Sequence, residues 1–413
     1  MSSALSADDL FKIADRAMTA SRFRDAEAIY RALSRDADGE VRAEARFRLG
    51  LMFASMRRYS AAARSFRNLL DEKPDASRVR LELARVLALM GDEDAARRQL
   101  RQAQAAGLPP EVAITVGRFA NALRNSHRVG GSLEVALAPD SNINRATKAT
   151  TIDTVIAPLT LNQDARARPG VGAKLSGEAY GRLPLANGVN LLARGFGQAS
   201  LYGEGRFNDI STGLSIGPEF RAGTDRFRPA AGLGWRHYGG NLYAGTRSVS
   251  LNWLHSQGRR TQFLTDLSIA RARYPVNRLQ SGMIYDASVA IERGFSAKAG
   301  GSLTLSANRQ TARDQGYGTA SGGIALLLWR DLGAATIYGM ASYRHLGSDS
   351  RLSLYPNRRS DDYVRIGSGA SFRRLAVMGL APIVRFAYER NRSTVGIYGY
   401  RRFSVDAGII KAF

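Results

Sequence analysis

The sequence predicts a two-domain chain: an all-α solenoid over residues 1–126, followed by a 14-stranded antiparallel transmembrane β-barrel over residues 127–413. Three observations predict this organisation. Apolar residues recur with a period of 34 in the first quarter, and the period changes to two after residue 129. No window holds the roughly 18 to 20 apolar residues that a membrane-spanning helix needs.

The composition supports a folded chain and narrows the classes of function. Hydrophobic residues make up 44% of the 413 residues, which is ample for a large buried surface. The net charge of +23 suggests nucleic-acid binding, but the arginines spread over the whole chain without a recognition motif, so we expect no nucleic-acid partner. Cysteine is absent and the four histidines lack metal-ligand spacing, so we expect no metal site and no cofactor.

Small and large apolar residues of the first quarter occupy matching positions 34 residues apart. The packing positions are Leu49, Gly50, Phe53, Ala62 and Phe66 in one unit, and Leu83, Ala84, Ala96 and Leu100 in the next. This pattern resembles the tetratricopeptide repeat, in which small residues let antiparallel helices approach closely and large ones fill the gap. We expect residues 111–125 to add a capping or connecting helix. A repeat domain of this kind holds a peptide or protein in its groove; an ordinary helical bundle is the alternative.

From Val129 to the end, apolar and polar residues alternate. The strand-like segments are 129–144, 169–182, 188–202, 207–222, 226–239, 243–257, 260–274, 281–293, 299–310, 317–330, 333–346, 361–374, 378–391 and 400–413. Their lengths of about ten to fifteen residues match tilted strands that cross a bilayer, whereas strands of a soluble sandwich are shorter. Only helices and closed barrels satisfy their backbone hydrogen bonds inside hydrocarbon, so the segments predict a barrel.

The linkers between these segments predict an outer-membrane barrel. The linkers 182–188, 222–226 and 257–260 are short, whereas 145–168 and 346–361 are long. Short inner turns and long outer loops place the helical domain in the periplasm. Aromatic residues near strand ends, such as Tyr202, Trp235, Trp253 and Tyr400, are expected in interfacial girdles. The final Phe413, with alternate apolar residues before it, is expected to be the signal for the barrel-assembly machinery. The start of the chain lacks the basic and apolar regions of a secretory signal, which leaves the export route open.

A polar run follows the apolar face of the first strand. Asp140, Asn142 and Asn144 occupy alternate positions, so they point into the lumen near its outer mouth if the register continues past Pro139. The alternative is that they hydrate the wall or cap a turn, because Asp-Ser-Asn is favourable turn chemistry. The many arginines are interpreted as a solvated wall and carry no predicted site.

The run DSNINRAT after a short repeat region, and the tail YERNRSTVGIYGYRRFSVDAGIIKAF, resemble the surface lipoprotein assembly modulator family, called Slam. The resemblance covers essentially the whole chain, and its motif maps onto Asp140, Ser141, Asn142, Asn144 and Arg145. It implies a bacterial outer-membrane translocon whose periplasmic repeats receive a client, and whose barrel helps to deliver that client to the cell surface. The implied partners are a surface lipoprotein or secreted protein and outer-membrane lipids. No covalent chemistry is implied, so we expect no enzyme.

Three other functions remain open at this stage. An exopolysaccharide export porin also joins tetratricopeptide repeats to a barrel, and abundant arginine suits an anionic polymer. A passive porin needs no client-holding solenoid. A membrane-embedded hydrolase would use His237, His255 or His345, but none has a matched serine and carboxylate spacing.

Overall fold

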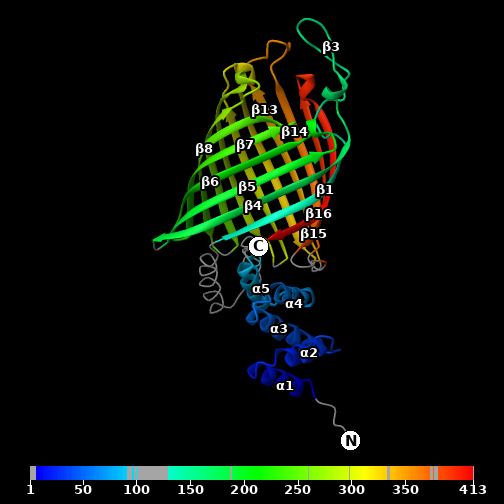
Figure 1. Cartoon of the computed structure of the whole chain (residues 1–413), viewed down its shortest axis with the longest axis vertical. Coiled ribbons are helices and arrows are strands. Elements are labelled where there is room, and N and C mark those ends of the chain that lie inside the picture. The colour runs from blue at the N-terminus through cyan, green and yellow to red at the C-terminus, as the bar shows by residue number, and fades with distance from the viewer. Residues whose placement is uncertain are drawn as a thin grey trace.

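Two bodies make up the protein: a stack of helices, and a β-barrel that stands above it in Figure 1. The computed structural model describes residues 6–90, 95–96, 99, 129–186, 188–258, 260–296, 298–332, 335–372, 375 and 380–412. The proposed domain boundary at 126/127, the helix expected over 111–125, Leu100 and Phe413 lie outside the described residues. Predictions about them stay predictions.

The helices form antiparallel pairs, as the 34-residue period predicts. They are α1 (Ala7–Thr19), α2 (Phe23–Leu33), α3 (Gly39–Ser55), α4 (Tyr59–Glu72) and α5 (Ser77–Leu89). The side chains of Ser6 and Asp38 cap α1 and α3 by accepting from the backbone N–H groups of Asp9 and Glu40. None of the described helices is both long enough and apolar enough to cross a bilayer.

Repeat positions named from the sequence lie in one continuous helical core. Those that are buried are Leu49, Gly50, Phe53, Ala62, Phe66, Leu83, Ala84 and Ala96. Gly50 of α3 shows why a small residue is needed, because a Cβ atom there would lie 2.4 Å from the ring of Phe66 in α4. The close approach of α3 and α4 therefore depends on the missing side chain.

Fourteen strands within the described residues close into an antiparallel barrel. They are β1 (Val129–Asp140), β4 (Gly170–Ala186), β5 (Val189–Tyr202), β6 (Asp209–Ala222), β7 (Asp225–Tyr238), β8 (Asn241–Gln257), β9 (Thr261–Arg273), β10 (Gly282–Gly294), β11 (Ala299–Gln310), β12 (Thr319–Asp331), β13 (Thr336–Ser348), β14 (Ser360–Ser371), β15 (Ala381–Ser393) and β16 (Tyr400–Ala412). Each strand pairs with its neighbours in sequence, and β1 closes the ring against β16. The predicted two-domain fold is confirmed.

The outer face of the barrel is apolar, which makes it a membrane barrel of the outer-membrane type. In β1 the side chains of Leu133, Val135 and Leu137 are 50%, 40% and 59% exposed, whereas Ala136 and Asp140 between and beyond them are buried toward the lumen. The same division continues round the ring, with Leu214, Val249, Ile269, Leu305, Ile324 and Ile366 among the exposed residues. So large an exposed apolar band is stable only against lipid.

Short turns lie at the end of the barrel that faces the helices, and long loops lie at the other, which we call the outer end (Figure 1). Residues 223–224 join β6 to β7, whereas the outer segments 141–169 and 349–359 are long. The first of these carries the small hairpin β2 (Thr151–Ile152) and β3 (Leu159–Thr160). Ile152, Leu161, Tyr355 and Val395 form an apolar cluster that packs three outer loops against one another.

Two expectations about strand residues are wrong. The first strand ends at Asp140 and not at residue 144, so Asn142 and Asn144 do not continue its alternation. Tyr202 and Tyr400 face the lumen and not a lipid girdle, because they share a face with Lys174 and Arg402 across their ladders. Trp235 and Trp253, in contrast, are exposed on the outer face.

Candidate functional site

The barrel closes through an interrupted ladder between β1 and β16, which we call the seam. Ser132 to Leu137 pair with Ala412 to Ala407, and pairing then resumes only at Asp140 with Ser404. The break falls at Ala138 and Pro139, where proline has no N–H to donate. Among the described residues, every other pair of neighbouring barrel strands has more paired positions than the seam.

A buried ion cluster holds the outer end of the seam. Arg402 of β16 donates from Nε to Asp140 Oδ2 at 2.9 Å, and from Nη1 to Glu389 Oε1 of β15 at 3.0 Å. The side chains of Asp140, Glu389 and Arg402 are 0%, 3% and 6% exposed. We call these three residues the seam clamp. Arg402 thus pairs with carboxylates from both ends of the barrel sequence, and Asp140 of the predicted motif is one of them.

Two further ion pairs cross the seam lower in the lumen, each by passing over a strand. Arg385 of β15 reaches across β16 and donates to Glu134 of β1 at 2.7 Å. Lys174 of β4 reaches across β1 and donates to Asp406 of β16 at 2.5 Å. These pairs are partly exposed to the lumen. Together with the seam clamp they link β15 and β16 to β1 and β4 where the backbone ladder is weakest.

Ser141 and Asn142 extend the closure beyond the last strand pair. Ser141 donates its backbone N–H to the Phe403 carbonyl at 2.9 Å, and its Oγ accepts from the Phe403 N–H at 2.8 Å. Asn142 is fully buried. Its Nδ2 donates to the carbonyls of Arg401 at 3.0 Å and Ala146 at 2.9 Å, while its Oδ1 accepts from the Ala146 N–H at 3.0 Å.

Asn144 and Arg145 fasten the far end of the same outer loop. Asn144 Nδ2 donates to the Arg166 carbonyl at 2.8 Å, and its Oδ1 accepts from the Arg168 N–H at 3.2 Å. Arg145 has a φ of 49°, which reverses the chain, and its Nε lies 3.7 Å from Glu389 Oε2. The motif residues are therefore brought together at the seam, where each joins the loop or β1 to another segment.

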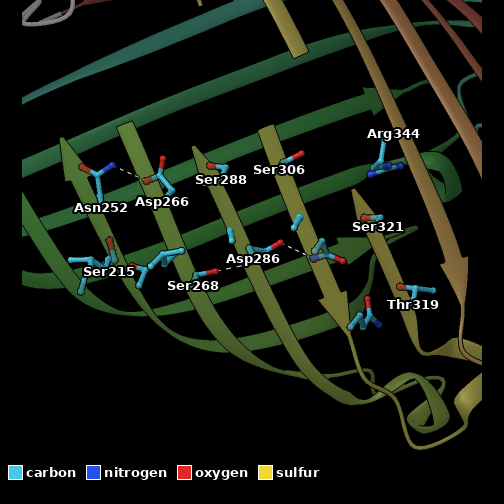
Figure 2. A pocket seen from close by; sticks show the side chains of 18 of the residues that line it. Ser215, Asn252, Asp266, Ser268, Asp286, Ser288, Ser306, Thr319, Ser321 and Arg344 are labelled. Carbon is cyan, nitrogen blue, oxygen red and sulfur yellow. Dashed lines mark hydrogen bonds between the residues drawn. The ribbon is translucent and has the colours of Figure 1, made fainter. Parts of the chain in front are cut away.

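Inside the barrel lies a cavity of about 820 Å³ lined mainly by polar side chains. Figure 2 shows serine, threonine, asparagine and aspartate side chains arranged on neighbouring strands around this space. Barrels of about eight strands are filled by side chains and those of sixteen or more leave a channel, so a partly open lumen is expected at fourteen.

One sector of the lumen contains no cation. The inward-facing residues of β8 to β12, all five of which are fully described, include Ser288, Ser306, Asp266 and Asp286 but neither lysine nor arginine. We call this sector the hydroxyl wall. Arg344 of the adjacent β13 lies on one side of it, Arg194 of β5 lies beyond β6 and β7 on the other side, and both line the same cavity. The lumen therefore has an anionic sector with cationic flanks.

Sequence reasoning missed the cations that hold the seam. Arg385 and Arg402 were part of what was interpreted as a solvated wall, and Lys174 was given no role, yet each of the three pairs with a carboxylate across the seam. The parity of the last two strands was an available signal, since it places Arg385, Glu389 and Arg402 on the inward face. The histidines lie elsewhere: His255 and His345 contact Asp225 and Asp362 on outward-facing positions of the barrel.

Several solved structures show a similar arrangement of elements at low sequence identity. An anion-selective porin from Comamonas acidovorans is 13% identical, with a TM-score of 0.37 over 69% of this chain and 98% of that one. A loop-deletion mutant of OmpT, an outer membrane protein of Vibrio cholerae, is 8% identical, with a TM-score of 0.41 over 69% and 98%. The type III secretion translocator chaperone SycD of Yersinia enterocolitica is 21% identical, with a TM-score of 0.26 over 30% and 94%. None of these likenesses says what the chain does.

Family comparisons are more specific. A curated relative, surface lipoprotein assembly modifier 1 of Neisseria meningitidis serogroup B, is 29% identical over 231 residues, which are 54% of this chain. The match spans 45% of the length of that relative, so less than half of it is represented here. A tetratricopeptide repeat model matches residues 53–115. A model described as surface lipoprotein assembly modifier matches residues 131–413, which is more than half of the chain and confirms the resemblance seen in the sequence. The chain therefore belongs to the surface lipoprotein assembly modifier family.

Proposed function

We propose that the chain is an outer-membrane translocon for a client surface lipoprotein or secreted protein. The repeats receive the client in the periplasm, and the barrel promotes its delivery across the outer membrane to the cell surface. The observation that carries the proposal is the union of a family barrel with tetratricopeptide helices at its short-turn end. In outer-membrane barrels the short-turn end faces the periplasm. A client on its way to the cell surface would reach the protein from that side.

The proposed work is binding and conduit formation without a covalent step. Repeat domains bind peptides and proteins through stacked helix pairs, which suits a receiving role. The barrel supplies a polar lumen in place of the lipid. Outer-membrane lipids and the barrel-assembly machinery, which would read the terminal Phe413, complete the proposed set of partners. The motif residues Asp140, Ser141, Asn142, Asn144 and Arg145 are proposed to hold the outer end of the seam closed and the outer loop in place while this occurs.

The charge of the lumen supports this proposal over an exopolysaccharide porin. Cations attract an acidic polymer and carboxylates along its path repel it. The hydroxyl wall instead presents Asp266 and Asp286, which would repel such a polymer.

The test is delivery of a client in a bacterium that expresses the full chain beside a lipoprotein encoded near it. Exposure of the lipoprotein is measured by its susceptibility to protease added to intact cells. Surface exposure that requires the chain is the expected result. A Gly50→Val variant, whose added side chain would clash with the ring of Phe66 in the helical domain, is expected to lose this exposure. Exposure that is independent of the chain, or unchanged by this variant, contradicts the proposal.

A further inference from the structure

Charges of both signs line the lumen cavity without an oppositely charged partner among the described residues. On the hydroxyl wall, Asp266 accepts from Asn252 Nδ2 at 2.7 Å, and Asp286 accepts from Asn308 Nδ2 at 2.6 Å (Figure 2). These partners are neutral amides, and both carboxylates are exposed to the cavity. The described residues donate neutral hydrogen bonds to these two charges and do not neutralise them.

The flanks of the hydroxyl wall carry the complementary charge. Arg194 of β5 and Arg344 of β13 are exposed to the same cavity, and neither lies within ion-pair distance of a carboxylate in the described parts of the chain. Arg344 lies over the ring of Tyr363, 5.1 Å from its centroid. The seam cations behave differently, because Arg402 and Arg385 are occupied by carboxylates.

Charges of both signs around one polar cavity, without oppositely charged partners among the described residues, favour a ligand that carries both. Charge complementarity selects partners by penalising like-charge contact and desolvation without compensation. A neutral sugar chain would leave all four charges uncompensated, and an anionic polymer would meet two carboxylates. An extended polypeptide, with ammonium and carboxylate side chains and polar backbone groups, can satisfy both sectors and the serine hydroxyls between them.

We propose that the lumen cavity is a binding site for extended peptide segments of mixed charge, which hold their ammonium groups at Asp266 and Asp286 and their carboxylates at Arg194 and Arg344. This deepens the proposed function by naming the lumen as the route and the chemistry of the passenger, and to that extent it rests on the proposed function. The site itself stands on the cavity and its four charges.

The chain contains no cysteine, so single cysteines can report the potential at chosen points of the lumen. Ser288 is the cross-strand partner of Asp266, and Ser215 is the cross-strand partner of Arg194. Ser288→Cys and Ser215→Cys are made in the full chain, which is folded into phospholipid vesicles. Each is labelled with a cationic and with an anionic methanethiosulfonate of similar size, and the ratio of the two rates is measured.

We expect Ser288→Cys to react about fivefold faster with the cationic reagent, and Ser215→Cys to show the opposite preference, as unit charges a few ångströms away in water require. Adding Asp266→Asn and Asp286→Asn abolishes the preference at Ser288→Cys. Asp153→Asn, an exposed carboxylate in the outer loop, is the matched control and leaves both ratios unchanged. Cysteines that do not react, or that react with both reagents equally, overturn the proposal.

Binding is then measured as protection from labelling. The tetrapeptide Lys-Gly-Gly-Glu at millimolar concentration slows labelling at both cysteines by about twofold or more, as expected of a weak site, and the two aspartate substitutions abolish the protection. Equal or better protection by maltoheptaose or by polyglutamate overturns the proposal in favour of a sugar or an anionic polymer. The labelling assay contains no client, so its result is independent of the delivery assay. If labelling depends on reagent charge but delivery fails, only the proposed function is contradicted. If labelling does not depend on reagent charge but delivery is intact, only this inference is contradicted.

Discussion

The seam and the hydroxyl wall face each other across the barrel, since β10 lies seven strands from β1 in either direction round the ring. They are held together by different means. The β9–β10 ladder pairs every position from Gly282 to Arg293, whereas the seam ladder breaks at Ala138 and Pro139. Ion pairs cross the seam, whereas the two aspartates of the hydroxyl wall contact only neutral groups among the described residues.

The difference shows that backbone hydrogen bonds hold the strands together at the hydroxyl wall, whereas side-chain ion pairs supplement a shorter ladder at the seam. Where the ladder is complete, closure does not depend on any one side chain, and lumen charges are left for a passenger. Where the ladder is short, a few side chains carry the closure, and each is committed to a partner. Single substitutions should therefore have unequal effects in the two sectors.

The largest effect is expected for Arg402→Ala, which leaves Asp140 buried without its cation and removes from Glu389 the nearest of its three arginines. Removing one partner of a buried ion cluster costs about 3–5 kcal/mol. The measurement is the free energy of unfolding in urea, followed by tryptophan fluorescence with the chain in phospholipid vesicles.

Arg194→Ala is the matched control for this substitution, because Arg194 faces the lumen without a carboxylate partner among the described residues. Its expected effect on the free energy of unfolding is within about 0.5 kcal/mol. Equal losses for the two variants would mean that the seam clamp does not hold the seam.

Asn142→Ala should have the next largest effect. The substitution leaves the carbonyls of Arg401 and Ala146 without their donor in a fully buried site, at a cost of about 1–3 kcal/mol. Unfolding in urea is again the measurement. Asn252→Ala, which removes a hydrogen bond to the exposed Asp266, is expected to be nearly neutral, and a reversed order of the two variants would contradict the comparison.

A smaller effect is expected from acid at the outer loop beside the seam. The hydrogen bond from Arg206 lowers the pKa of Glu204 below its ordinary value of 4.5, and Arg168 adds to this. A lowered pKa means that the contact is fully present above pH 4.5 and is lost as the pH falls through the lowered pKa. The backbone amides of residues 145–168 should therefore exchange faster as the pH falls below 4.5, after correction for intrinsic rates.

Two controls accompany the acid experiment. Residues 274–281, between β9 and β10 at the hydroxyl wall, contain no carboxylate, so their protection should not change over the same range. Glu204→Gln should reproduce the loosened loop at neutral pH. A loop that keeps its protection in both conditions would show that Glu204 does not hold it.

The smallest effect is expected from locking the seam. Val135 and Ile409 are cross-strand partners on the outward face, close enough for a disulfide, as are Val289 and Leu305 on the opposite side. If the lumen is the route, Val135→Cys/Ile409→Cys and the control pair should both leave client delivery unchanged when oxidised. If delivery stops only when the seam is crosslinked, and returns when the disulfide is reduced, the client passes through the seam and not through the lumen.

The sequence predicted the barrel well because the signal for it is local. The alternation of Leu133, Val135 and Leu137 with inward residues is visible within one strand, and parity alone assigns a face to most positions. The repeat positions were visible for the same reason. The error at the end of β1 also came from this rule, since alternation cannot show where a turn such as that at Arg145 begins.

The site could be predicted only in part because its contacts are long-range. Asp140 and Arg402 are 262 positions apart, and their meeting depends on the number of strands and on the register at closure. The motif drew attention to Asp140 and Asn142, but no pattern in the sequence named Arg402 or the Arg401 carbonyl as partners. The polarity of the lumen likewise emerges only when five separate strands are placed side by side.

The distance along the chain between Asp140 and Arg402 also has a consequence for biogenesis. Asp140 of the first strand has no cation to pair with until β16 brings Arg402 beside it. A truncated or half-inserted chain therefore has an unpaired carboxylate at the open edge of its sheet. Closure of the barrel between β1 and β16 and neutralisation of Asp140 therefore occur together. A chain that lacks the last strand therefore lacks the cation that neutralises Asp140.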